Sequence, residues 1–274
     1  MRSDTPPALK RASLPVRLAR VAFRLFALAY VSLTELSWFG VTTLFGRKYS
    51  HRARTLWLQR TCRRFLHLIG TRIAVHGALP TGGLIASNHL SYVDILALST
   101  VTGCSFVSKM EVKSWPIFGA FAKLTGTVFV RRESRNDAMR AQSELQDVLA
   151  NGECVVLFPE GTTTDASHVL PFRSPMFQAA IESATTITPC AISYALIDGD
   201  VGNELCYWGD MTLLPHLLNL FTKQNIWCSI SFGEPVAATG DRKSLADDLQ
   251  WRVAALKVEN DKNVMQEMKA EGSK

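Results

Sequence analysis

The 274-residue sequence lacks the signatures of several common protein classes. Its six cysteines are scattered, without a Cys-x-x-Cys pair or a Cys/His cluster, so the pattern indicates no zinc site and predicts buried thiols in a reducing compartment. A Gly-x-Ser-x-Gly motif is absent, and a serine-hydrolase mechanism therefore has no evident nucleophile. Internal repeats and low-complexity tracts are absent as well. With 47% hydrophobic residues, the chain is long enough for one large domain, or a domain plus an appendage, with an ample core.

A long uncharged run is also missing. The segment from Val21 to Phe45 is strongly apolar, but Arg24 and Glu35 leave about ten uncharged residues between them, and a spanning helix needs about 20. We therefore expect one or two helices that lie in the membrane interface, with a single N-terminal span as the alternative. A cleaved signal peptide is not expected, because the apolar run starts late and has no clear small-residue cleavage site.

Acidic residues are scarce in the first part of the chain. Residues 1–75 contain 14 Lys and Arg against Asp4 and Glu35, a net charge of +12 in a chain whose total is +6. This asymmetry predicts an anionic partner. Because the basic residues enclose an apolar stretch, we expect an anionic membrane surface and not nucleic acid.

The rest of the sequence alternates β-like and helical runs, which predicts an α/β fold with a mostly parallel or mixed sheet flanked by helices. An amphipathic helix is expected over 55–70. The predicted strands are Arg72–His76, Gly83–Ser87, Ser105–Ser108, Thr127–Arg131, Glu153–Phe158, Thr186–Tyr194, Leu205–Trp208 and Ile226–Phe232. The predicted helices are Tyr92–Thr100, Trp115–Leu124, Asp137–Ala150, Pro175–Ser183 and Leu245–Val258. We divide the chain into a basic, apolar membrane-associating segment (1–54), an α/β domain (55–258) and a polar C-terminal tail (259–274) that is expected to fray.

The most informative stretch is Ser-Asn-His-Leu-Ser-Tyr-Val-Asp at 87–94. It lies where an apolar, strand-like run passes into a helix-like run, a position that often carries catalytic residues. Asp94, in the first turn of that helix, can fold back onto the ring of His89, so the pair is typical of an imidazole general base oriented by an acid. The alternative is structural: Ser91-x-x-Asp94 is also an acidic variant of the capping box.

Three further sequence blocks, together with the stretch at 87–94, show a resemblance to a known family. The Asn-His-x4-Asp motif (88–94), followed about 65 residues later by Phe-Pro-Glu-Gly-Thr (158–162), resembles the glycerolipid acyltransferase family that includes lysophosphatidic acid acyltransferases. A Gly-Thr-Val-Phe-Val-Arg-Arg block (126–132) and an apolar block around a proline (187–192) resemble two other family motifs and occur in the family's order. The resemblance covers about residues 80–235, and four ordered blocks are a specific signal.

The resemblance implies roles for individual residues. His89 would be the general base and Asp94 would orient it. Arg132 would bind a phosphate of the acceptor through its forked guanidinium. The other residues that the resemblance assigns to the acceptor are Arg131, Lys109, Glu160, Gly161 and Thr162. Without the resemblance, the arginines would indicate a solvated cluster at a helix start, and Pro-Glu-Gly an ordinary strand-ending turn.

The implied activity is a membrane-associated O-acyltransferase. It would move an acyl group from acyl-CoA or acyl carrier protein to a lyso-lipid hydroxyl, most commonly that of 1-acyl-sn-glycerol-3-phosphate, giving phosphatidic acid in phospholipid biosynthesis. Thr163 stands where the common form has arginine, so lyso-ornithine lipid or another lysophospholipid is the alternative acceptor. The apolar stretch Trp115–Leu124 would line an acyl tunnel or be plain core.

No metal or organic cofactor is implied, and acyl-CoA or acyl carrier protein would be a co-substrate. The expected location is the cytoplasmic face of the inner membrane, with a monotopic attachment or a single N-terminal span. Two functions of other classes stay open: a lipid hydrolase or transacylase, and a non-catalytic membrane-binding module.

Overall fold

The computed structural model describes residues 11–131 and 135–272. The strands in this part of the chain are β1 (Thr71–His76), β2 (Gly83–Ser87), β3 (Ser105–Lys109), β4 (Val128–Val130), β5 (Cys154–Leu157), β6 (Thr186–Leu196), β7 (Ile226–Phe232) and β8 (Val236–Ala237). Within the described residues they form one eight-stranded sheet in the order β1-β7-β6-β2-β5-β3-β4, with β8 paired to β6. β6 is antiparallel to β7 and to β8, and the other neighbours are parallel. This mixed sheet confirms the predicted fold class.

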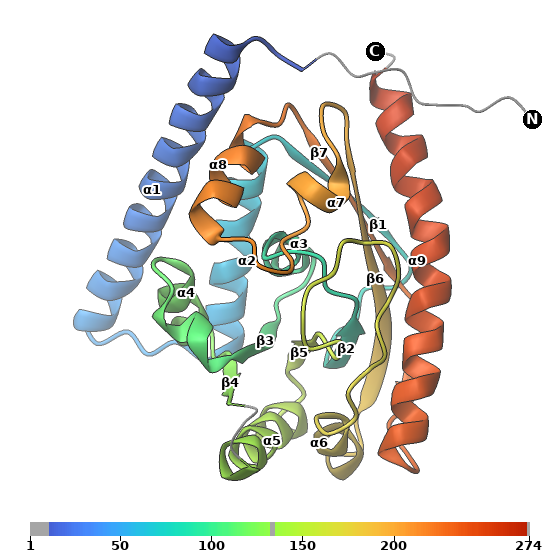
Figure 1. Cartoon of the computed structure of the whole chain (residues 1–274). Helices are drawn as coiled ribbons and strands as arrows, with labels where there is room; N and C mark the ends of the chain where they lie inside the picture. Colours follow the sequence, from blue (N-terminus) through green and yellow to red (C-terminus); the bar gives the residue numbers. More distant parts are fainter. Residues whose placement is uncertain (1–10, 132–134, 273–274) are drawn as a thin grey trace, which may run out of the picture.

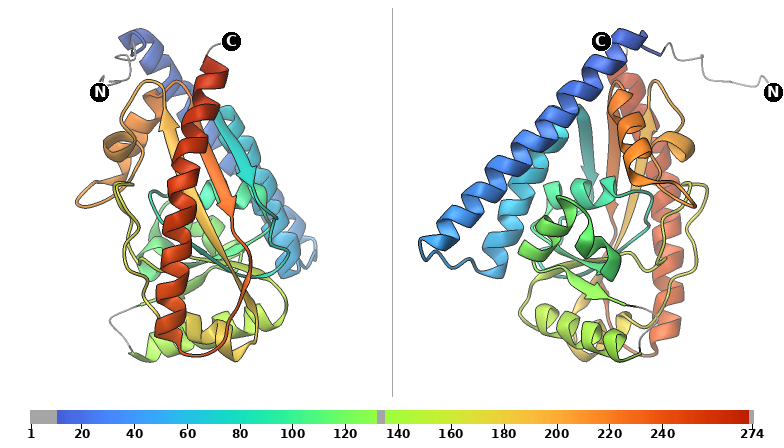
Figure 2. Two further views of the ribbon diagram at one scale, coloured as in Figure 1. Left: turned by 90° about the vertical axis from the view of Figure 1, so that its right-hand side faces the viewer. Right: turned by 60° about the vertical axis from the view of Figure 1, so that its left-hand side comes forward.

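Helices flank the sheet on both sides (Figure 1). They are α1 (Leu14–Leu44), α2 (His51–Leu68), α3 (Val93–Val101), the 3-10 helix η1 (Met110–Ser114), α4 (Phe118–Leu124), α5 (Arg135–Ala150), α6 (Phe177–Glu182), α7 (Val201–Glu204), α8 (Leu213–Thr222) and α9 (Arg242–Gly272). Figure 2 shows that α1 and α9 lie on opposite sides of the sheet. α9 packs directly on β6 and β7, whereas α1 contacts α2 and α8.

Two apolar cores cover the two faces of the sheet. Along β2, Ile85 belongs to the core shared with α2, α3 and α8, while Leu84 and Ala86 belong to the core shared with α5, α6 and α9. Because both faces are covered, β2 and β5 are buried along their whole length and do not alternate apolar with polar residues. β2 and β5 are parallel neighbours, so their carboxyl ends meet at one edge of the sheet. The segments that follow Ser87 and Leu157 are thereby brought together.

The two charges inside the apolar N-terminal stretch point toward the protein. Arg24 is buried and its guanidinium donates to the main-chain oxygens of Phe221 (2.9 Å), Lys223 and Gln224 at the end of α8. Glu35 is also buried; it accepts hydrogen bonds from Arg64 and, at 2.9 Å, from the Trp57 indole. No helix in residues 11–131 or 135–272 is both long enough and apolar enough to cross a membrane.

Two predictions about the second half of the chain were wrong. Leu205–Trp208 is not a strand: the N–H groups of Leu205 and Cys206 continue the turn of α7 by donating to the Val201 oxygen. The C-terminal tail does not fray over residues 259–272, because α9 continues to Gly272. Its polar sequence conceals a packing face, on which the buried Asn260 side chain donates to the main-chain oxygens of β6 and β7.

Candidate active site

The turn after β2 is fixed by its first polar residue. The side chain of Asn88 pairs with the main chain of Ile192 on β6: its Nδ2 donates to the Ile192 oxygen at 3.0 Å, and its Oδ1 accepts from the Ile192 N–H at 2.8 Å. Asn88 is buried, so these two bonds are shielded from water. The arrangement ends the strand and holds the next residue, His89, at the edge of the sheet.

His89 and Asp94 contact each other as the sequence predicts. The Nδ1 atom of His89 lies 2.8 Å from Oδ2 of Asp94, which is completely buried in the first turn of α3. The same oxygen accepts from the N–H groups of Leu90 (2.6 Å) and Ser91 (2.9 Å). Asp94 therefore both fixes the turn that precedes α3 and orients the ring. Because a carboxylate only accepts, Nδ1 carries the hydrogen, and Nε2 is the nitrogen that can take a proton.

The loop after β5 holds His89 from the other side. The ring of Phe158 stacks on the imidazole, with 3.9 Å between the ring centroids. Glu160 is buried; its Oε1 accepts from the His89 N–H at 2.8 Å and its Oε2 from the Leu170 N–H at 2.9 Å. Burial raises the pKa of Glu160 to about 7, against the lowering effect of these two N–H groups. The predicted role of Glu160 in holding the acceptor stays a prediction; the contacts connect it to the backbone of His89.

A pocket opens beside the His89 ring. Its wall combines the end of β3, where Lys109 lies, with the loop after β5, which contributes Gly161, Thr162 and Thr163. The aromatic part of the wall consists of Tyr92, Trp115, Phe118, Phe158 and Tyr207. Three of the residues assigned to the acceptor, Lys109, Gly161 and Thr162, are thus brought together with His89, the predicted general base.

Of the two arginines assigned to the acceptor, the structure describes Arg131. Arg131 is exposed, outside the set of described residues that line this pocket, and its Nε lies 3.8 Å from Asp137. Arg132 lies outside the described residues. Their role in binding the acceptor stays a prediction.

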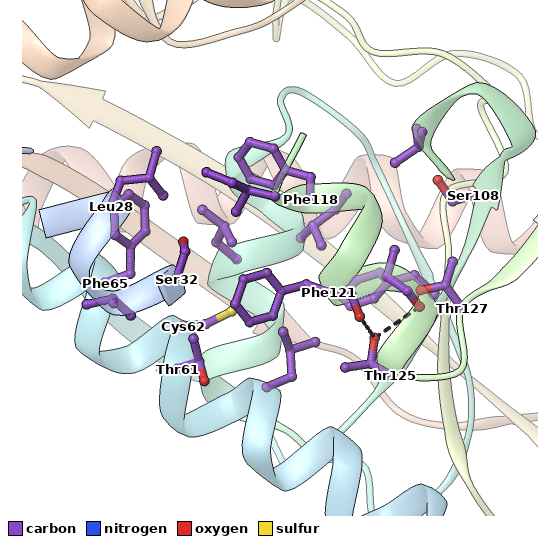
Figure 3. Close-up of a pocket in the computed structure, with 18 residues that line it drawn as sticks. Leu28, Ser32, Thr61, Cys62, Phe65, Ser108, Phe118, Phe121, Thr125 and Thr127 are labelled. Atoms are coloured by element: carbon purple, nitrogen blue, oxygen red, sulfur yellow. Dashed lines mark hydrogen bonds between the residues drawn. The ribbon is translucent and has the colours of Figure 1, made fainter. Parts of the chain in front are cut away.

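A second, strongly apolar pocket adjoins the first (Figure 3). The two pockets share the wall residues Ile95, Phe106, Ser108, Val112 and Phe118. From the stretch Trp115–Leu124, Ile117, Phe118 and Phe121 line the apolar pocket. The opposite wall comes from α1 and α2 and was not predicted; it consists of Leu28, Val31, Ser32, Leu58, Thr61, Cys62 and Phe65. The sequence predicted the amphipathic helix over 55–70, but not a pocket between α1 and α2.

One contact of the site was not predicted from the sequence. The hydroxyl of Tyr194, on β6, donates to Oδ1 of Asp94 at 2.8 Å, across 100 positions of sequence. Tyr194 lies in β6 among side chains that are otherwise small or aliphatic, and a buried tyrosine needs a partner for its hydroxyl. This requirement indicates that the Tyr194 hydroxyl has a hydrogen-bond partner, but it does not identify Asp94 as that partner.

A mixed α/β sheet, with a carboxylate-held imidazole at a strand end and two adjoining pockets beside it, defines an α/β fold with a candidate active site at its strand ends. The sequence model of the family described as Acyltransferase matches residues 72–193. The chain belongs to this acyltransferase family.

Several known proteins are similar to it. The chain is 42% identical over 205 residues to a lyso-ornithine lipid O-acyltransferase of Brucella abortus, covering 69% of this chain and 77% of that protein. It is 32% identical over 186 residues to a 1-acyl-sn-glycerol-3-phosphate acyltransferase of Neisseria gonorrhoeae, covering 65% and 70%. The crystal structure of the 1-acyl-sn-glycerophosphate acyltransferase PlsC from Thermotoga maritima superimposes with a TM-score of 0.64 at 19% identity, covering 93% of this chain and 98% of that one. This structural likeness supports the fold.

Proposed function

We propose that the protein transfers an acyl group from a thioester donor, acyl-CoA or acyl carrier protein, to the free hydroxyl of a lyso-lipid. The observation that carries the proposal is the His89–Asp94 contact of 2.8 Å at the wall of a pocket that adjoins an apolar one. We place lyso-ornithine lipid first among the acceptors and 1-acyl-sn-glycerol-3-phosphate second.

The reaction follows from the ring orientation. The acceptor hydroxyl gives its proton to Nε2 of His89 as its oxygen attacks the thioester carbonyl. The resulting imidazolium lies against the carboxylate of Asp94, which stabilises the positive charge. Collapse of the tetrahedral species breaks the carbon–sulfur bond, and the departing thiolate takes the proton from the imidazolium. An oriented base of this kind is typically worth about 10²–10⁴ in rate.

The pocket beside His89 supports the choice of acceptor. Among the described residues that line it, Lys109 is the one lysine or arginine, and Thr163 stands where the common lysophosphatidate form has arginine. An arginine there would suit a phosphate but would repel the ammonium of an ornithine head group. The greater identity to the Brucella lyso-ornithine lipid enzyme than to the Neisseria enzyme points the same way. Lys109 is the feature that favours the second candidate.

The apolar pocket is suited to the acyl chain. Its wall is almost wholly apolar, and the five residues it shares with the His89 pocket would let a chain extend from the reacting carbonyl into it. Ser32 and Thr61, on the wall formed by α1 and α2, line this apolar pocket and not the His89 pocket.

The surface of α1 supports attachment to a membrane. The outward face of α1 and the residue after it expose many large apolar side chains: Leu14, Val16, Leu18, Phe23, Leu25, Phe26, Tyr30, Leu33, Trp38, Val41, Leu44 and Phe45. The two charged residues between 21 and 46, Arg24 and Glu35, are both buried. We infer that this face lies in the interface of an anionic leaflet, at the cytoplasmic side of the inner membrane, with basic residues at both ends of the helix near the lipid head groups.

The acceptor is tested by transfer from one labelled acyl donor to lyso-ornithine lipid and to 1-acyl-sn-glycerol-3-phosphate in parallel. We expect the wild type to favour lyso-ornithine lipid, and Thr163→Arg to move the ratio of the two kcat/KM values toward the phosphate acceptor by about tenfold. Ser167→Arg, which adds the same charge at an exposed site of the same loop, is the control.

Each contrary result has its own meaning. A wild type that favours the phosphate acceptor would replace the first candidate with the second. Release of free fatty acid without any acceptor product would indicate a hydrolase. Inactivity toward every lyso-lipid offered would contradict the proposed function.

A further inference from the structure

We propose that Tyr194 is a positioning residue for acyl transfer, which holds His89 in register by fixing the carboxylate of Asp94. The inference rests on the proposed function. Tyr194 lies on β6 and Asp94 on α3, and the phenol oxygen is 2.8 Å from Oδ1. Both side chains are buried, so water does not compete with this bond.

The two oxygens of Asp94 have separate tasks. Oδ2 accepts from Nδ1 of His89 and from the N–H groups of Leu90 and Ser91, all of which belong to the turn between β2 and α3. Oδ1 accepts from Tyr194, which belongs to the central strand β6. A carboxylate held at Oδ2 alone can still rotate about its Cβ–Cγ bond. The second anchor fixes the carboxylate plane, and with it the direction of the imidazole.

Tyr194 also favours the charge that the base requires. With a neutral imidazole and an ionised Asp94, the pair carries one negative charge, and the phenol O–H stabilises that anion. Burial and the nearby Asp94 raise the pKa of Tyr194 well above its ordinary value, so the phenol keeps its proton. Tyr194 is directly opposite Cys228 in the β6–β7 register.

The other titratable groups near the pair include the Glu160 carboxyl from the loop after β5, the thiols of Cys190, Cys206 and Cys228, and, in the wall of the His89 pocket, Lys109, Tyr92 and Tyr207. Burial raises the pKa of each thiol, so the thiols stay neutral over the working range of the base. Burial raises the pKa of Glu160 to about 7, and this residue is unchanged in the variants below, so its effect is common to all of them.

The test is Tyr194→Phe in the full-length protein, with pH profiles of kcat/KM. The variant keeps the ring and loses one O–H that donates to a charged group. We expect kcat/KM to fall about tenfold, mainly through kcat. The acid limb should move to higher pH, because the anionic pair loses a donor and binds a proton more readily.

Ser193→Ala is the matched control. Ser193 is the preceding residue on β6 and is equally buried, but its hydroxyl donates to Asp261 on α9 and not to the catalytic pair. It should leave the position of the acid limb unchanged. Adding Tyr194→Phe to an Asp94→Asn background should cause little further loss, because the phenol acts through Asp94.

A second arm avoids any loss of folding in the variant. Uniform incorporation of 3-fluorotyrosine makes the phenol a stronger donor, and Tyr194 is the tyrosine that hydrogen-bonds Asp94 in the described structure. The acid limb of the labelled wild type should then move to lower pH. A wild-type profile in Tyr194→Phe, an equal shift in Ser193→Ala, or an unmoved limb in the labelled protein would each overturn the inference. Inactivity of the unmodified wild type toward every lyso-lipid would instead overturn the proposed function.

Discussion

The N–H of His89 donates to Oε1 of Glu160 over 2.8 Å. This bond joins the two motifs that the sequence separates by about 65 residues, since Glu160 follows β5 and His89 follows β2. The parallel pairing of β2 with β5 places both turns at one sheet edge, and the Glu160 carboxylate then fixes the backbone of His89, the proposed general base. The second motif therefore supports the first directly.

Glu160 should make stability depend on pH. Burial raises its pKa in the folded protein to about 7, while the unfolded group titrates near 4.5. The folded state thus keeps a proton that the unfolded state has lost, and the stabilisation present below pH 4.5 disappears as the pH rises through about 7. Melting temperatures between pH 4 and 8 should show this decline in the wild type and a flatter profile in Glu160→Gln. The exposed control Glu182→Gln should follow the wild type, and parallel curves for all three proteins would contradict the assignment.

His89→Ala should abolish most of the activity. Loss of the base is expected to lower kcat by about 10²–10⁴, measured as transfer of a labelled acyl group to the preferred lyso-lipid. Asp94→Asn should retain the ring but lose the carboxylate that orients it. His168→Ala, at an exposed histidine of the loop after β5, is the control. Full activity in His89→Ala would reduce the His–Asp contact to a capping feature.

Arg24 should connect α1 to the α/β domain. Its guanidinium binds three main-chain oxygens at the end of α8, and burial lowers its pKa to about 10, so the charge persists at neutral pH. Arg24→Met would leave three buried oxygens without this partner, at a cost of about 3 kcal/mol. The free energy of unfolding from urea titration measures the loss, with the exposed Arg52→Met as control. An equal effect of both substitutions would show that general charge matters, and not this contact.

Ser32 should influence the length of the acyl chain used. It is buried on α1 at the helical wall of the apolar pocket, and leucine there would occupy space that the end of a chain requires. Ser32→Leu should lower kcat/KM for long-chain donors about tenfold and leave short-chain donors nearly unchanged. Ser37→Leu makes the same change at an exposed position of α1. A uniform loss across all chain lengths would argue against this location for the chain.

The elements that sequence predicted well are those that depend on local pattern. Gly83–Ser87 is both the predicted and the observed strand, because its apolar run is bounded by polar turns. The His89–Asp94 contact was also accessible, since both residues belong to one strand-to-helix turn. These features need no information from distant parts of the chain.

The features that were missed depend on tertiary packing. The partner of Tyr194 is 100 positions away, and the polar segment after Lys257 became helical because Asn260 matches main-chain oxygens exposed by the sheet. From its polar composition alone, that segment was expected to fray. The wall that α1 and α2 contribute to the apolar pocket was also not predicted, because it depends on how the two helices pack together.

The outward face of α1 should bind the membrane surface. Phe26 is 67% exposed at the middle of this apolar face, so Phe26→Glu would place a charge where the proposal puts lipid. Sedimentation with vesicles of neutral and anionic phospholipid should show binding of the wild type that is stronger to anionic vesicles, and a loss of at least tenfold in Phe26→Glu. Trp251→Glu is the matched control, because Trp251 is 69% exposed but lies on α9, on the opposite side of the sheet (Figure 2). If both variants lose binding equally, attachment is not confined to α1; if neither loses it, this face does not hold the protein to the membrane.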